Sequence, residues 1–112
     1  MQKKIDLDQY KIIEKTSYLD KKIGLMLQKL KDKEIALFSF KKEVDHNFHT
    51  FFMLQSIDMV FLNKNRRVVQ YEQKIKPYQT IKAEEKYKYV IEANEGFIEK
   101  KNISLNDKIS KS

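Results

Sequence analysis

The sequence predicts a mainly β (α+β) fold: a small antiparallel barrel or rolled sheet of six or seven short strands with two short helices. Its 112 residues suit one domain, spanning residues 1–112, with a core of its own. Short apolar or alternating runs, the usual length of strands, fill most of the chain. Sequential strands joined by short turns favour antiparallel pairing, and rolling or closing the sheet protects its edges.

The first half of the chain is expected to form four strands and one helix. Residues 10–15 form a short strand, and apolar residues at helical spacing predict a helix over 17–30. Residues 35–40 are apolar on both faces, which is typical of a central strand. Two further strands follow at 48–54 and 57–62.

A hairpin is expected next, because residues 63–66 are polar and rich in Asn, which tolerates the left-handed backbone of tight turns. The strand after this turn, 67–75, alternates cleanly. The alternation predicts that Val69, Tyr71 and Ile75 face the core and that the polar residues between them face solvent.

The remaining elements are a loop, two strands and a short helix. Residues 76–86 form a polar loop, and 87–93 alternate as a strand. Asn94 is placed to cap a helix at 95–101, and a last short strand lies within 103–109.

The positive charge of the chain does not favour a nucleic-acid partner. Lys and Arg total 23 against 16 Asp and Glu, a net charge of +7, but 21 of the 23 are Lys. Arg makes the bidentate contacts that phosphate and guanine prefer, and clustered charge is what phosphate binding needs. Here the basic residues are spread along the whole chain. A solvated Lys-rich surface explains them.

Several classes of site are disfavoured by composition. The chain has no Cys and two His, so a disulfide framework or a thiolate zinc site is excluded and no metal is predicted. Neither a phosphate-binding glycine loop nor a dinucleotide motif occurs, so no cofactor is predicted. With no apolar run of about 18 residues, no membrane partner is expected. The charged start lacks a signal sequence, which predicts a cytoplasmic protein.

Asp58 is the sharpest anomaly, because it is the only charged residue between His49 and Leu62. A buried carboxylate must be hydrogen-bonded, paired or protonated. One interpretation is structural, with Asp58 accepting backbone N–H bonds. The other is functional, with its surroundings tuning it for acid or base work beside His49.

The order of motifs resembles the uncharacterised family known as domain of unknown function 192, over about residues 10–110. The resemblance is carried by Gly24-Leu25-Met26, Ala36-Leu37-Phe38-Ser39-Phe40, His49-Thr50-Phe51-Phe52-Met53, Ile57-Asp58-Met59-Val60-Phe61-Leu62 and Tyr89-Val90-Ile91-Glu92-Ala93. It implies a mainly β fold, no established activity, and candidate site residues His49, Thr50, Met53 and Asp58. Relatives often have Gly in two turns where this chain has Arg66 and Asn106.

Three functional hypotheses follow. The first, which we favour, is a module that binds a small molecule or peptide in a cleft near His49 and Asp58. The second is an enzyme with these two residues as an acid–base pair. The third is a weak nucleic-acid binder using its Lys residues and two loop tyrosines expected to be exposed, Tyr78 and Tyr87.

Overall fold

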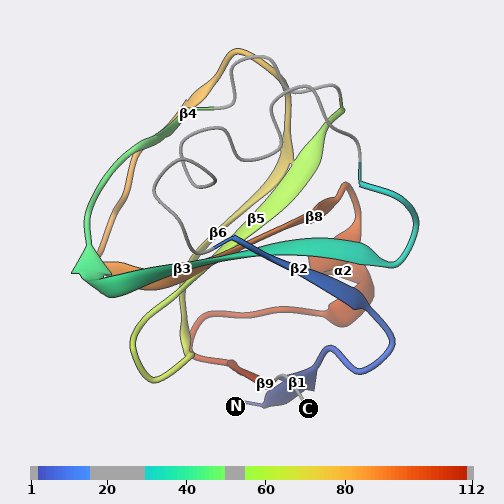
Figure 1. The fold of residues 1–112 in the computed structure, drawn as a ribbon, viewed down its shortest axis with the longest axis horizontal. Helices are drawn as coiled ribbons and strands as arrows, with labels where there is room; N and C mark the ends of the chain where they lie inside the picture. The colour runs from blue at the N-terminus through green and yellow to red at the C-terminus, as the bar shows by residue number, and fades with distance from the viewer. Residues whose placement is uncertain (1–2, 16–29, 50–54, 111–112) are drawn as a thin grey trace.

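The computed structural model describes residues 3–15, 30–49 and 55–110, which form a mainly β domain (Figure 1). The predicted helix over 17–30 and the predicted strand residues 50–54 lie outside these ranges. Within them, no helix combines the length and apolar character that crossing a membrane requires.

A five-stranded sheet forms the centre of the domain. Its strands in spatial order are β2 (Lys11–Lys15), β3 (Glu34–Val44), β8 (Tyr87–Asn94), β5 (Ile57–Leu62) and β6 (Val68–Ile75). All neighbours are antiparallel except β2 and β3, which run parallel. Because β2 and β6 do not pair with each other, the sheet is open. The mainly β prediction is confirmed, but the sheet does not close into a barrel.

Two small strand pairs and a short helix cover the sheet. Strands β1 (Lys4–Asp6) and β9 (Lys108–Ser110) pair in parallel, and β4 (Phe48–His49) pairs antiparallel with β7 (Thr80–Ile81). Helix α2 (Phe97–Lys101) follows β8 directly. Figure 1 shows the β1–β9 pair and the chain ends on one side of the central sheet and β4 on the other.

The sheet is buried on both faces, so the domain has two apolar cores. We call the first the terminal-side core; its buried members are Ile5, Leu7, Ile35, Val60, Leu62, Val68, Ile91, Ala93, Phe97, Ile98, Ile103 and Ile109. We call the second the β4-side core; its buried members are Leu30, Ala36, Phe38, Ile57, Met59, Phe61, Ile75, Tyr87 and Val90. All six residues of β5 are buried, which confirms the expectation of an enclosed strand apolar on both faces.

The predicted orientation of β6 is confirmed for buried Ile75 and exposed Lys74 but is wrong around Gln70. Gln70 is 3% exposed, whereas Tyr71, which was expected to face the core, is 37% exposed. The register with β5 shifts at both ends of β6, and each extra residue of a β-bulge moves the following side chains to the other face. The buried amide of Gln70 is fully used: Nε2 donates to the carbonyl of Lys82, and Oε1 accepts from the N–H of Glu84.

Tyr87 is fully buried, which confirms an inward position in the alternating strand 87–93 and contradicts the expected exposure beside the loop, whereas Tyr78 is 70% exposed as predicted. The register between β3 and β8 shifts after Ser39, so β3 bends and the Tyr87 ring packs edge-on against Phe61 with centroids 5.0 Å apart. The Tyr87 hydroxyl donates to the carbonyl of His46 at 2.5 Å. Burial, together with the Asp45 carboxylate, raises the pKa of the Tyr87 phenol.

Replacing Tyr87 with Phe is expected to lower the free energy of unfolding by about 0.5–1.5 kcal/mol, the net worth of one hydrogen bond. The ring keeps its packing, so the loss measures the hydroxyl alone. Urea denaturation followed by fluorescence or circular dichroism measures it, with Tyr71→Phe on the exposed side of β6 as the control. Equal stability of the two variants would contradict a structural role for the Tyr87 hydroxyl.

One strand in each of the two small pairs carries no local signal in the sequence. β1 was not predicted, and β7 lies within a segment expected to be a loop. Strand β1 has three residues and pairs with β9, more than 100 residues later in the chain. Such short strands exist only because a distant partner is brought beside them.

Candidate functional site around Asp58

Asp58 lies on β5 with its carboxylate on the terminal side of the sheet, and it is 1% exposed. Oδ1 accepts a hydrogen bond from the backbone N–H of Lys74 at 2.9 Å. Oδ2 accepts from the N–H groups of Gly96 at 3.2 Å and Ile98 at 2.9 Å. Three backbone donors from two distant segments therefore satisfy the carboxylate.

The two bonds to Oδ2 explain how α2 begins. Its N-cap residue is Gly96, in the left-handed region at φ 98°, and glycine has no side chain with which to cap the helix. The first N–H groups of a helix have no partners within the helix. Asp58 reaches across from β5 and accepts two N–H bonds at this start, including that of Ile98.

The predicted cap, Asn94, is therefore wrong: it is the last residue of β8, and the helix starts two residues beyond the expected position. The side chain of Asn94 instead accepts a hydrogen bond from Gln55 and donates one to the carbonyl of Lys31 at 3.3 Å. It thereby ties β8 to the segment before β3. The predicted end of the helix is correct, because Asn102 forms the C-cap at φ 53°.

This bonding favours the structural interpretation of Asp58. A carboxylate enclosed by backbone donors is held as an acceptor and has no reacting group beside it in the described part of the chain. The acid–base hypothesis thus loses support at the residue on which it depended.

Of the other three candidate residues, only His49 lies within the described ranges. His49 is the second residue of β4, where its backbone pairs with Thr80 over the β4-side core. Thr50 and Met53 lie outside the described residues. Strand β4 and the carboxylate of Asp58 belong to opposite sides of the central sheet.

A groove lies beside the turn that Asp58 holds. Its volume is about 260 Å³, and it is lined by residues 32–34, residues 93–97, Tyr10 and Lys100. Phe97 and Tyr10 form an apolar wall with their rings edge to face at 5.4 Å between centroids. Gly96, whose N–H is bonded to Asp58, belongs to the lining. Asp58 thus shapes the groove from beneath without entering it.

The groove carries both signs of charge. Lys33 and Lys100 supply two positive charges, and Asp32, Glu34 and Glu95 supply three negative ones. Glu34 is partly engaged, since Oε1 accepts the N–H of Lys31 at 2.7 Å. In the ranges that the structure describes, no three His, Asp or Glu side chains converge in the way that a metal site requires.

Sequence reasoning missed three further buried polar side chains: Gln70, Glu92 and Asp107. Glu92 lies on the central strand β8, opposite Ala36 on β3 and Met59 on β5, and is 5% exposed. The signal that singled out Asp58 was present here too, because Glu92 is the only charge in an apolar run. The expected alternation of the strand hid it, since every second residue was expected to face solvent.

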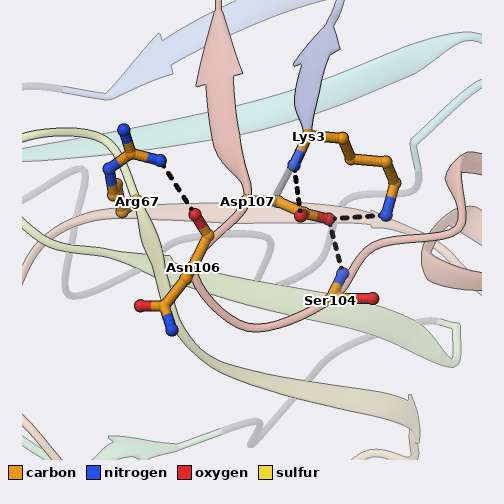
Figure 2. Close-up of polar contacts among 5 residues, drawn as sticks. All are labelled: Lys3, Arg67, Ser104, Asn106 and Asp107. Atoms are coloured by element: carbon orange, nitrogen blue, oxygen red, sulfur yellow. Dashed lines mark hydrogen bonds and ion pairs between the residues drawn. The ribbon is translucent and has the colours of Figure 1, made fainter. Parts of the chain in front are cut away.

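Asp107 is fully buried and fastens the two ends of the chain together (Figure 2). Its carboxylate accepts hydrogen bonds from the backbone N–H of Lys3 at 3.1 Å, from the Lys3 ammonium at 2.8 Å and from the N–H of Ser104 at 2.8 Å. Burial by itself raises the pKa of Asp107, but the bonds from Lys3 and Ser104 and the Lys3 charge outweigh it and lower that pKa.

The fold and the site together define a small, mainly β domain with an open central sheet. Two of its strands bury a carboxyl side chain, Asp58 on β5 and Glu92 on β8, and three backbone N–H groups hold that of Asp58. Comparison with known proteins identifies the family. The model of domain of unknown function 192, described as "Uncharacterized ACR", matches residues 8–111, and the chain belongs to this family.

Relatives of the same family occur in archaea. The chain is 31% identical to a UPF0127 protein of Pyrococcus horikoshii over 93 residues, covering 83% of this chain and 80% of that protein. It is 27% identical to a UPF0127 protein of Pyrococcus furiosus, covering 83% and 79%. A crystal structure of a protein of unknown function from Novosphingobium aromaticivorans has the same fold, with a TM-score of 0.82 at 22% identity over 88% of this chain and 73% of that one.

Proposed function

We propose that this chain is a binding module for a small zwitterionic molecule or a short peptide, held in the groove beside residues 94–97. The observation that carries the proposal is the groove itself, together with the way Asp58 fixes its wall. A turn tied to the core by a buried carboxylate is preorganised, and preorganisation lowers the entropic cost of binding.

The size of the groove supports a small ligand. Sites for drug-sized molecules usually measure about 300–1,000 Å³. A groove of about 260 Å³ falls just below that range and suits a free amino acid or a dipeptide. Tyr10 and Phe97 offer an apolar wall against which an aliphatic or aromatic side chain packs.

The mixed charge of the groove supports a zwitterion over a ligand of one sign. Lys100 and Lys33 suit a carboxylate, while Glu95 and Asp32 suit an ammonium group. Because opposite charges line one groove, a singly charged ligand would satisfy one set and face repulsion from the other. This is the reason for choosing amino acids and dipeptides as probes.

The test is a thermal-shift series with the full chain, using free amino acids and dipeptides and, in parallel, the same compounds blocked at both ends. At ten times its Kd a ligand adds about 1.4 kcal/mol to the native state, which raises the midpoint by several degrees. We expect the free zwitterions to raise it and the blocked compounds to have no effect.

A pair of variants on one helix locates the site. Lys100→Gln is expected to weaken the zwitterion at least tenfold, whereas Glu99→Gln, one residue away and outside the groove, keeps its affinity. Equal stabilisation by blocked compounds, or equal affinity of the two variants, would overturn the proposal, as would the absence of any shift across the series.

A further inference from the structure

We infer that a second cavity, on the terminal side of the sheet, binds a monocarboxylate with a short aliphatic tail. The cavity has a volume of about 60 Å³ and lies between the central sheet and the β1–β9 pair. It shares no lining residue with the groove of the proposed function, so this inference stands independently of that proposal.

The interior of this cavity is apolar. Its walls combine side chains from the central strands with side chains from the segments near the two chain ends: Leu7, Leu37, Leu62, Ile91 and Ile109. An apolar cavity of about 150 Å³ accommodates benzene, with six carbon atoms. By that measure the present cavity accommodates a tail of two or three carbons.

The mouth of the cavity is polar and is lined by one positive side chain, Arg66, and one negative side chain, Glu14. Arg66 and Tyr89 line it, with the guanidinium 5.7 Å from the centre of the Tyr89 ring, and the Lys88 ammonium lies 4.8 Å from the same ring. Glu14 contributes the one negative charge among the described lining residues, and Ser39 adds a hydroxyl. Together with Lys88, which lies next to the lining residue Tyr89, two positive charges stand against one negative charge, which matches a monocarboxylate and disfavours a dianion such as phosphate.

The backbone conformation of Arg66 fixes where its side chain leaves the turn. Arg66 has φ 63°, in the left-handed region, where glycine or asparagine is the usual residue. This conformation costs a long side chain about 1–3 kcal/mol. Lys33, Lys74 and Tyr78 also adopt it, so the position of the Arg66 guanidinium, and not the strain, points to a ligand. The turn brings the guanidinium to the mouth of the cavity, where it lies over the Tyr89 ring and is able to bind a carboxylate through two N–H groups.

The inference is tested by NMR titration of the full chain with sodium isobutyrate, sodium hexanoate and the uncharged isobutyramide. We expect saturable shifts at Leu62, Ile91 and Ile109 with isobutyrate, with a Kd on the order of 1 mM, which is typical for so small a ligand. Hexanoate should bind at least tenfold more weakly because its tail exceeds the cavity. Isobutyramide should bind at least tenfold more weakly because it lacks the charge.

Variants in one turn separate recognition from stability. Arg66→Asn keeps a residue that tolerates the left-handed backbone, so the turn is retained, and the affinity for isobutyrate should fall at least tenfold. Lys64→Gln removes an exposed charge from the same turn and should leave the affinity unchanged. The inference is overturned if isobutyramide binds as well as isobutyrate, if both variants retain the affinity, or if isobutyrate produces no saturable shifts at these residues.

Discussion

Replacing Asp58 with Ala is expected to lower the free energy of unfolding by about 3–5 kcal/mol, because three backbone N–H groups lose their acceptor at once. The N–H group of Ile98 is buried and those of Lys74 and Gly96 are partly buried, so water replaces the lost acceptor only incompletely. A domain of this size is stabilised by about 5–15 kcal/mol in total, so the variant is expected to be close to unfolding at 37 °C.

Urea denaturation measures the loss of stability, and two further variants serve for comparison. Asp58→Asn keeps one acceptor oxygen, so it should lose about half as much stability as Asp58→Ala. It still loses some stability because its amide N–H₂ group faces backbone N–H donors and has no acceptor there. Asp32→Ala removes an exposed acid and should change stability by less than about 0.5 kcal/mol. A loss below about 1 kcal/mol for Asp58→Ala would contradict the structural role of the carboxylate.

The second large effect is expected at Asp107. Asp107→Ala should lower the free energy of unfolding by about 2–4 kcal/mol, because it removes the acceptor for Ser104 and for both donors of Lys3. The β1–β9 pair closes the terminal-side core, so its loosening should expose Ile5 and Ile109. Hydrogen exchange is expected to accelerate first in β1 and β9.

The same residue predicts how stability depends on pH. The folded-state pKa of Asp107 is lower than its usual value, so the folded chain releases this proton more readily than the unfolded chain. Its contribution is therefore complete above the unfolded pKa of about 3.9 and is lost as the pH falls through the lower folded pKa. The stability difference between the wild type and Asp107→Asn should be constant near pH 7 and shrink below about pH 4.

A matched acid in an exposed position provides the control for this titration. Asp8→Asn, close to the same end of the chain, should leave both the stability and its pH dependence nearly unchanged. If the stability difference between the wild type and Asp107→Asn stayed constant down to pH 2, the Lys3–Asp107 pair would contribute nothing that depends on the charge of Asp107.

The structure gives a physical meaning to two places where the chain departs from the usual family pattern. Arg66 and Asn106 occupy turns in which relatives often have Gly, and both have left-handed backbones, at φ 63° and 71°. Asn tolerates this region, whereas Arg does so with more strain. The departure at residue 106 is therefore conservative, while the departure at residue 66 adds a guanidinium to the mouth of a cavity.

Local pattern was sufficient to predict all five strands that form the central sheet. The six residues of β5 are apolar at all but one position, and such a run has no favourable place except between two cores. The segments that became β2, β3 and β8 were recognised for similar reasons. Where bulges shift the register, as in β6, pattern failed, because one extra residue reverses which side chains are buried and the sequence does not mark its position.

The candidate site also combines a feature that the sequence predicts with contacts that only the tertiary structure determines. The sequence by itself determined that Asp58, a single charge in an apolar run, had to be satisfied in the interior, because an isolated buried carboxylate is too costly. Only the tertiary structure decided which groups satisfy it, since its donors lie 16, 38 and 40 residues away along the chain. No local spacing encodes such partners. They meet because β8 pairs with β5 and delivers the start of α2 to the carboxylate, while β6, on the other edge of β5, supplies Lys74.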